Sequence, residues 1–250
     1  MDFFVRFQAI NDNDKAALVR KLMESSTPDF DFFYITSLSV FMATLGLLLG
    51  SSSIVIGSML IAPLMYPILG VALGLVMSNP NVLGRSFGTL VKSLAIGLGV
   101  AIIAAFFFGD QNMYMTSEVL SRTIPNHLYF MVAIIAGAAV SFALARPEWS
   151  ETLPGISISV ALIPPLATVG VGIAALNAEI IKGASVLLLL NLIGIIAASA
   201  GSFMMMNLYQ KQNIAQSTIK RENERLEEEK AVIEEISKHN GNLHEEHERA

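Results

Sequence analysis

The chain has 250 residues, of which 53% are hydrophobic and 15% are charged, and its formal net charge is −5. Soluble domains are close to one quarter charged, so this composition argues against a soluble globular protein. The sequence contains no cysteine, which excludes disulfides, cysteine metal sites and thiol chemistry.

Charged residues are concentrated in 1–31 and 207–250, and the sequence between them is a series of apolar blocks. Each block is about 20 residues long or more, enough for a helix to cross about 30 Å of hydrocarbon. The prediction is therefore an all-α, polytopic membrane protein. A cytoplasmic N-terminal segment (1–31) precedes the membrane domain (32–208), and a charged helical cytoplasmic tail (209–250) follows it, with a disordered end.

Six transmembrane helices are predicted, three in each half of the membrane domain (32–108 and 129–208). The expected spans are Phe32–Leu49, Ser53–Met77, Ser86–Phe108, Tyr129–Ala145, Leu153–Leu176 and Gly183–Leu208. The side that carries most lysine and arginine is expected to be cytoplasmic, and it holds both termini. Those cations are Arg6, Lys15, Arg20, Lys21, Arg85, Arg146, Lys211, Lys220 and Arg221. The opposite side carries only Arg122 and Lys182.

Two proline-containing stretches, 57–74 and 159–176, indicate that the halves are related. A shift of 102 positions aligns six identical residues in these stretches. The identities pair Leu60 with Leu162, Ile61 with Ile163, Pro63 with Pro165, Leu64 with Leu166, Gly70 with Gly172 and Ala72 with Ala174. Because each half has an odd number of spans, the second half would be upside down. The prediction is a 3+3 inverted-topology repeat with proline-broken second and fifth helices, an arrangement that many secondary transporters use.

Proline within a helix removes a hydrogen bond and leaves the carbonyl four residues earlier without its partner. In hydrocarbon such a carbonyl costs several kcal/mol unless another group satisfies it. Two helices broken at mid-depth would therefore create a polar site near the bilayer midplane. The alternative is that the prolines only bend helices for packing. The candidate binding residues around the breaks are Ser58, Pro63, Tyr66, Pro67, Ser159, Pro164, Pro165 and Thr168.

Lys92 and Asn191 are the polar residues expected to flank this site from opposite halves. A lysine within a span often marks a solute pathway, although Lys92 could instead extend its side chain to the inner interface. Asn191 could equally join two helices by hydrogen bonds. No predicted span contains Asp, Glu or His, and this favours an anionic or neutral polar solute over a cation held by a buried carboxylate.

Two polar segments outside the spans have structural interpretations. Glu118, Arg122 and His127 in the outer loop are expected to form loop salt bridges rather than a site. In the tail, Ile219 and Leu226 begin a heptad pattern that would suit a short coiled coil and a homo-oligomer. The alternative for the tail is a single solvated helix.

Four motifs, taken in order, resemble the domain of unknown function 389 family of bacteria and archaea. They are LIAPLMYPILGVALGL, SEVLSRTIPN, ALARPEWSETLPGISISVALIPPLATVGVGI and LLLLNLIGII. The resemblance covers about 32–208, and it implies a membrane fold in a prokaryotic cytoplasmic membrane and no established activity. The matching positions are Pro63, Pro67, Arg122, Pro125, Asn126, Arg146, Pro147, Pro154, Gly155, Pro164, Pro165 and Asn191.

The function expected from these features is transport or permeation of a small polar or anionic solute across the bilayer. The alternative is a non-transporting scaffold or sensor that acts through helix packing and its cytoplasmic tail. An enzyme is not expected because the spans carry no catalytic acid, base or metal cluster. No cofactor, metal or nucleic-acid partner is expected either.

Overall fold

The computed structural model describes residues 10–27, 29–146 and 154–248, without the side chains of 154–161, 235 and 237–248. The described residues form helices and no strand. The helices are α2 (Asp12–Ser25), α3 (Phe30–Leu48), α4 (Ser52–Met59), α5 (Met65–Met77), α6 (Pro80–Phe108), α7 (Ser117–Leu120), α8 (His127–Leu144), α9 (Pro154–Ala174), α10 (Ala178–Met205) and α11 (Gln212–Glu248). Two short 3-10 helices, Met113–Met115 and Leu208–Lys211, lie in connections.

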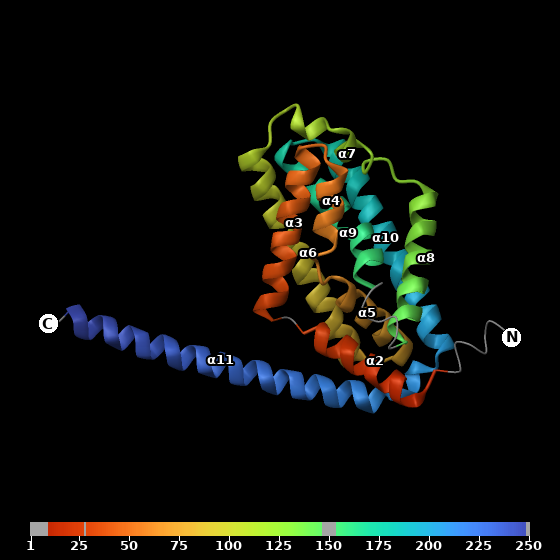
Figure 1. Cartoon of the computed structure of the whole chain (residues 1–250), viewed down its shortest axis with the longest axis vertical. Helices are drawn as coiled ribbons and strands as arrows, with labels where there is room; N and C mark the ends of the chain where they lie inside the picture. The colour runs from red at the N-terminus through yellow and green to blue at the C-terminus, as the bar shows by residue number, and fades with distance from the viewer. Residues whose placement is uncertain (1–9, 28, 147–153, 249–250) are drawn as a thin grey trace.

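The long helices stand side by side and alternate in direction (Figure 1). α3, α6 and α9 run towards the end of the bundle that α7 covers, and α4, α5, α8 and α10 run away from it. We call these ends the α7 end and the α2 end, since α2 and α11 lie across the opposite end (Figure 1). Four described helices, α3, α6, α8 and α10, are long and apolar enough to cross a membrane. α5 and the segment Leu162–Ala174 of α9 are shorter apolar helices.

The expected second span is divided where Pro63 lies. α4 ends at Met59 and α5 begins at Met65. The end of α4 tightens: the N–H of Ile61 donates to the carbonyl of Ser58 at 3.2 Å. The hydroxyl of Ser39 in α3 also donates to this carbonyl, at 2.6 Å. A neighbouring helix thus supplies a hydrogen bond at the interruption.

Pro67 does not break a helix, because it lies in the first turn of α5, where backbone N–H groups have no intrahelical partner.

The expected break in the fifth span is not present. α9 is continuous from Pro154 to Ala174 and contains Pro164 and Pro165. Proline has a helical φ, so an adjacent pair can remain within a helix that its neighbours hold. Leu162 and Ile163, just before the pair, are fully buried. The hydroxyl of Thr168 donates to the carbonyl of Pro164 at 2.8 Å. Tertiary packing therefore outweighs the local tendency of these prolines to interrupt the helix.

The α5–α6 and α9–α10 connections have the same backbone geometry. Each contains a non-glycine residue with positive φ, 49° at Ser78 and 53° at Leu176. An asparagine follows in each, and its side chain accepts hydrogen bonds from two backbone N–H groups that begin the next helix, at Asn79 for α6 and Asn177 for α10. These asparagines are 98 positions apart. The separation is four residues, or about one helical turn, shorter than the shift of 102 that aligns the apolar residues.

The same separation of 98 relates other parts of the two turns. The N–H of Asn79 donates to the carbonyl of Gly74 at 3.1 Å, and that of Asn177 donates to Gly172 at 2.9 Å. The first residues of α6 and α10, Pro80 and Ala178, are also 98 apart. These two turns therefore correspond in sequence position, hydrogen bonding and backbone conformation.

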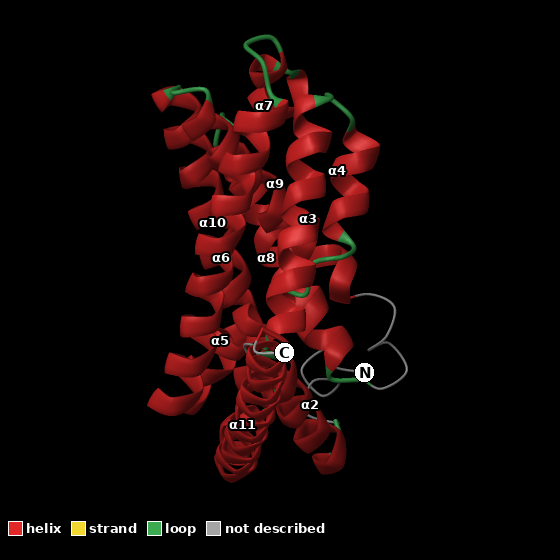
Figure 2. Ribbon diagram, turned by 90° about the vertical axis from the view of Figure 1, so that its left-hand side faces the viewer, coloured by secondary structure: helices red, strands yellow, loops and turns green. Residues whose placement is uncertain are grey.

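Helices α2 and α11 pack together at the α2 end, as both views show (Figures 1 and 2). Ion pairs join α2 to α11 and to the 3-10 helix before it: Arg221 of α11 contacts Glu24, and Lys211 of the 3-10 helix lies 3.3 Å from Asp12. The tail forms one helix of 37 residues, α11, which extends well beyond the bundle (Figure 1).

Candidate solute cavity

A cavity of about 290 Å³ lies between α4, α8, α9 and α10, and the turn after α7 closes one part of it. Its lining is mainly apolar, with an arginine, an asparagine, a serine and a tyrosine among the polar side chains. The lining residues are Ile56, Met59, Ser121, Arg122, Tyr129, Val132, Pro164, Pro165, Leu187 and Asn191.

The cavity extends from the α7 end to half the depth of the bundle. Pro164 lies ten residues from each end of α9, about 15 Å along a helix that rises 1.5 Å per residue. Asn191 is thirteen residues into the 28-residue α10, about 20 Å from its first residue. Arg122 follows α7 at the end of the bundle. The lining thus connects an arginine at one end with prolines and a 5% exposed asparagine at mid-depth.

The two proline-bearing segments meet at this cavity. α9 contacts both α4 and α5, and it runs in the opposite direction to them (Figure 1). Met59, the last residue of α4, lines the cavity together with Pro164 and Pro165. An interrupted helix and a helix with two missing N–H donors therefore face the same space.

Arg122 is held at the α7 end by a small polar cluster. Its Nη1 lies 2.7 Å from the carboxylate of Glu118 and 3.1 Å from the hydroxyl of Ser121, and it also donates to the Glu118 carbonyl. The hydroxyl of Ser52, at the start of α4, donates to the same carboxylate. The hydrogen bond from Ser52, followed by the hydrogen bond and charge of Arg122, lowers the pKa of Glu118.

This cluster leaves part of the Arg122 guanidinium available to a ligand. Among the described residues, its hydrogen bonds are made by Nη1. The opposite edge, Nη2 and Nε, is therefore not used by these partners. A guanidinium edge offers two parallel donors that match a carboxylate or phosphate. The expected loop salt bridge is present, and Arg122 in addition lines the cavity.

The structure gathers three of the expected binding residues, Pro164, Pro165 and Asn191, around one cavity. Pro63 and Tyr66 are half-buried and Pro67 is buried near the interruption, and they do not belong to the described lining.

Two further expected residues have structural partners. The buried hydroxyl of Ser58 donates to the carbonyl of Val55 at 2.6 Å, and Thr168 is bonded to Pro164. The side chain of Ser159 lies outside the described residues.

Lys92 is separated from the cavity, contrary to the arrangement expected with Asn191. It is exposed on α6, whereas its neighbour Ser93 is fully buried. The helical rotation of about 100° per residue explains why adjacent residues face such different surroundings. At the separation of 98, Ser93 rather than Lys92 corresponds to Asn191.

The apolar part of the lining was not predicted from the sequence, and Arg122 was expected in a loop salt bridge rather than in a site. Ile56, Val132 and Leu187 come from three helices and have no shared local motif. Arg122 had two available signals, its spacing of four from Glu118 and its place in the family motif, but both also fit a loop salt bridge.

Comparison with known proteins identifies the family of this chain. The model of the family described as "Domain of unknown function (DUF389)" matches residues 59–197. An uncharacterised protein of Methanocaldococcus jannaschii is 28% identical over 158 residues, which are 63% of this chain and 48% of the relative. The chain thus spans about half the length of this curated relative. No solved structure matches the chain. Because the family match covers more than half of the 250 residues, the protein belongs to the DUF389 family.

Proposed function

We propose that the protein crosses a prokaryotic cytoplasmic membrane six times and moves a small polar or anionic solute through the cavity described above. The observation that carries this proposal is a single cavity that joins Arg122 to the mid-depth prolines and Asn191. Its volume of about 290 Å³ is many times the roughly 10–15 Å³ that a single water molecule needs.

The proposed six-span topology counts α4 and α5 together as the second span and α9 as the fifth. Their alternating directions support it (Figure 1). The α2 end carries the helices with Arg20, Lys21 and Lys211 and is assigned to the cytoplasm by the positive-inside rule. The α7 end, with Arg122 and Lys182, is then external.

An inverted repeat is proposed for the two halves. The matching turns around Asn79 and Asn177 support it. The packing also supports it, since α5 contacts α6 and α10 while α9 contacts α10 and α6. Exchange of the two halves leaves this set of contacts unchanged, as expected for two related units of opposite direction.

The solute class follows from the groups that line the cavity. The described lining residues include an arginine and no acidic side chain. Desolvated guanidinium groups favour carboxylate or phosphate oxygens, and Asn191 can both donate and accept hydrogen bonds. We therefore propose a small solute with one anionic group, which binds first near Arg122 and then reaches Asn191.

A second candidate function, a scaffold or sensor, is favoured by α11. This helix extends beyond the bundle (Figure 1) and exposes Val232, Ile233 and Ile236. A cytoplasmic partner or a second copy of the chain could cover these side chains. In that case the cavity would carry no solute, and the two functions differ in whether water enters it.

Cysteine labelling tests whether the cavity is aqueous. The chain has no native cysteine, so single cysteines at Val132 and Asn191 can be compared with one at Ile135, which is 67% exposed on α8 but outside the described lining. A membrane-impermeant thiol reagent added to the α7 side should label the two cavity positions. It should not label Ile135, which lies on the same helix as Val132 but would face lipid. Equal protection of all three would contradict an aqueous cavity.

Flux measurements then test transport itself. Purified protein in liposomes is screened with small inorganic and organic anions and with neutral polar solutes. Arg122→Gln should lower anion flux about tenfold, the effect of losing one charge-assisted hydrogen bond. Lys182→Gln, which removes a cation from the same end outside the cavity, is the matched control. No flux for any solute, with the protein folded, would favour the sensor.

A further inference from the structure

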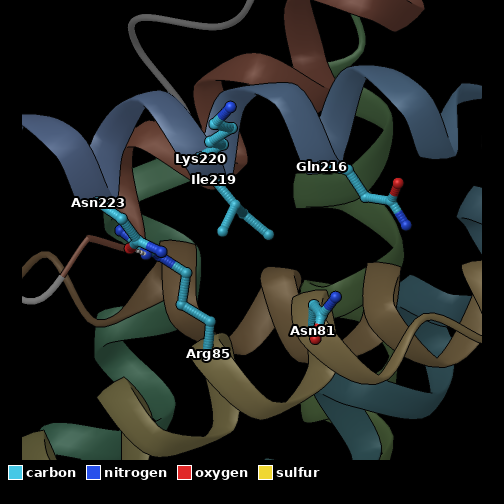
Figure 3. Close-up of a pocket in the computed structure, with 6 residues that line it drawn as sticks. All are labelled: Asn81, Arg85, Gln216, Ile219, Lys220 and Asn223. Atoms are coloured by element: carbon cyan, nitrogen blue, oxygen red, sulfur yellow. Dashed lines mark hydrogen bonds between the residues drawn. The ribbon is translucent and has the colours of Figure 1, made fainter.

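A second, more polar cavity of about 540 Å³ lies at the α2 end, between the first turns of α6 and the first half of α11. Figure 3 shows Arg85 reaching from α6 towards Asn223, while Gln216 and Ile219 point down from α11. The described lining consists of Asn81, Arg85, Gln216, Ile219, Lys220 and Asn223. It contains two cations, three amides and no carboxylate.

The hydrogen bonds of Arg85 are made to neutral groups. Its Nη2 donates to the hydroxyl of Thr27 at 3.0 Å and its Nη1 donates to Asn223. The buried Nε has no hydrogen-bond partner among the described residues, and no described carboxylate lies within ion-pair distance of this side chain. Because a partly buried cation is normally paired with an anion, this arrangement has room for one.

The nearest acidic groups among the described residues do not contact Arg85 and lie beside other cations. Glu222 is close enough to act electrostatically on Arg85, but it lies 3.3 Å from Arg225. Lys220 is 3.9 Å from Glu224, and its side chain is 78% exposed. Lys220 can therefore turn towards an anion beside Arg85 at little cost.

The surface of α6 above this cavity is apolar and open. An added Cβ at Gly84 or Gly88 would meet no atom within 4 Å. Phe87 and Val91 are 55% and 46% exposed. Lys92, seven residues beyond Arg85, lies on nearly the same face of the helix, and helical side chains lean towards the N-terminus. The polar cavity can hold a phosphate headgroup, and the open apolar strip beside it can hold an acyl chain, so the two together match the outline of a phospholipid.

We propose that this cavity binds the phosphate headgroup of an anionic phospholipid of the inner leaflet. Arg85, Lys220 and the amides contact the phosphate, one acyl chain lies along the strip at Gly84 and Gly88, and Lys92 extends down to the phosphodiester. Basic cavities between membrane helices on the cytoplasmic side suit such headgroups. The bound lipid would join α11 to the membrane domain. This inference rests on the proposed membrane orientation and is independent of solute transport.

Lipid binding by the full chain in a non-ionic detergent tests the proposal, with no flux measurement involved. The probes are dioleoylphosphatidylglycerol, dioleoylphosphatidylcholine and inorganic phosphate. Affinity is read from retained lipid in native mass spectrometry and from thermal stabilisation. Phosphatidylglycerol should bind best, and Lys220→Gln or Lys92→Gln should weaken it roughly fivefold, the share of one cation near an anionic lipid. Arg85→Gln should have at least the same effect.

The control is Lys182→Gln, which removes an exposed cation at the opposite end and should change the affinity less than twofold. Lys220 is exposed, so its variant preserves the fold even if Arg85→Gln does not. Equal binding of phosphatidylcholine, equal protection by inorganic phosphate, or an equal loss in the Lys182 variant would each overturn the proposal. The second of these outcomes would identify a soluble phosphate compound as the ligand.

Discussion

Replacing Gly74 or Gly172 by alanine should destabilise the protein by about the same amount. A Cβ at Gly74 would lie 2.7 Å from both the backbone N and the Cα of Leu83, at the start of α6. A Cβ at Gly172 would lie 2.8 Å from the Cγ2 of Ile180 and 3.0 Å from the backbone N of Ile181, at the start of α10. Normal carbon contacts are about 3.5–4.0 Å, so α5 and α6 would have to separate by about 1 Å, and α9 and α10 by about 0.5 Å after the methyl group of Ile180 has moved.

The expected cost follows from two opposing effects. Overpacking of a tight contact costs about 1–3 kcal/mol, whereas replacing a helical glycine by alanine contributes about 0.5–1 kcal/mol of stability. The net destabilisation is then about 0–2.5 kcal/mol for each variant, with a central value of about 1 kcal/mol. Gly88→Ala is the matched control, because an added Cβ there meets no atom within 4 Å and only the favourable effect remains.

The measurement is reversible unfolding in mixed micelles of increasing SDS fraction, followed by far-ultraviolet circular dichroism. If Gly74→Ala unfolds like Gly88→Ala, the close approach of α5 and α6 is refuted. If Gly74→Ala is destabilised and Gly172→Ala is not, the two turns are not equivalent, and the proposed repeat loses its main structural support.

The other predictions concern local hydrogen bonds and one carboxylate. Asn79→Ala and Asn177→Ala each remove a helix N-cap and should each lower the free energy of unfolding by about 1 kcal/mol in the same assay. Unequal losses of stability would contradict the equivalence of the two turns. Ser39→Ala removes the hydroxyl bonded to the carbonyl of Ser58 and should cost about 0.6 kcal/mol, measurable in a double-mutant cycle with Pro63→Ala. The lowered pKa of Glu118 gives stability that is present above its ordinary value of 4.5 and is lost as pH falls through the folded value. Glu118→Gln should therefore be less stable at pH 7 and lose less on acidification, as thermal melts at several pH values would show.

Helix positions could be predicted closely from the sequence because they depend on local composition. The first span was expected at 32–49, and α3 runs from Phe30 to Leu48. The effect of proline could not be predicted in the same way. Pro63 lies between two helices, while Pro164 and Pro165 lie within one. The missing N–H of a proline can be read from the sequence. Whether the helix continues through that proline depends on the neighbouring helices that pack against it.

The separation of 98 between the two matching turns could not be predicted from the sequence, because the feature that they share is conformational. The shift of 102 aligned apolar residues, which match easily among membrane helices. The shift of 98 becomes visible through Ser78 and Leu176, which share a positive φ but not a residue type. A leucine in this conformation is unusual, so the sequence offers no signal for it.

The cavity was partly predictable. Prolines at mid-depth on two segments identified where backbone donors are missing, and Pro164 does line the cavity. Arg122 enters it through the packing of α7: Thr116 donates to the carbonyl of Leu47 at 2.7 Å, and Val119 is fully buried. These contacts join segments about 70 residues apart in the chain, so their geometry cannot be read from local spacing.

The two proline segments differ in structure, and this difference leads to a prediction for the proposed transport cycle. Under the proposed transport function and inverted repeat, the two halves move against each other to give alternating access, and we infer that they exchange conformations between the outward-facing and inward-facing states. Here the segment with Pro63 is interrupted, the segment with Pro164 is continuous, and the cavity reaches the α7 end. The exchanged state should therefore have a continuous second span, an interrupted α9 and a cavity at the α2 end.

The lining of that second cavity follows from the separation of 98. Tyr66 and Pro67 correspond to Pro164 and Pro165, and Ser93 corresponds to Asn191. Tyr66 and Pro67 were expected at the site but lie outside the present cavity. After the exchange they would line the second cavity. A cysteine at Ser93 should react with an impermeant reagent from the α2 side only while a cysteine at Asn191 is protected from the α7 side. Simultaneous reactivity of both positions would mean a continuous pore and would exclude alternating access.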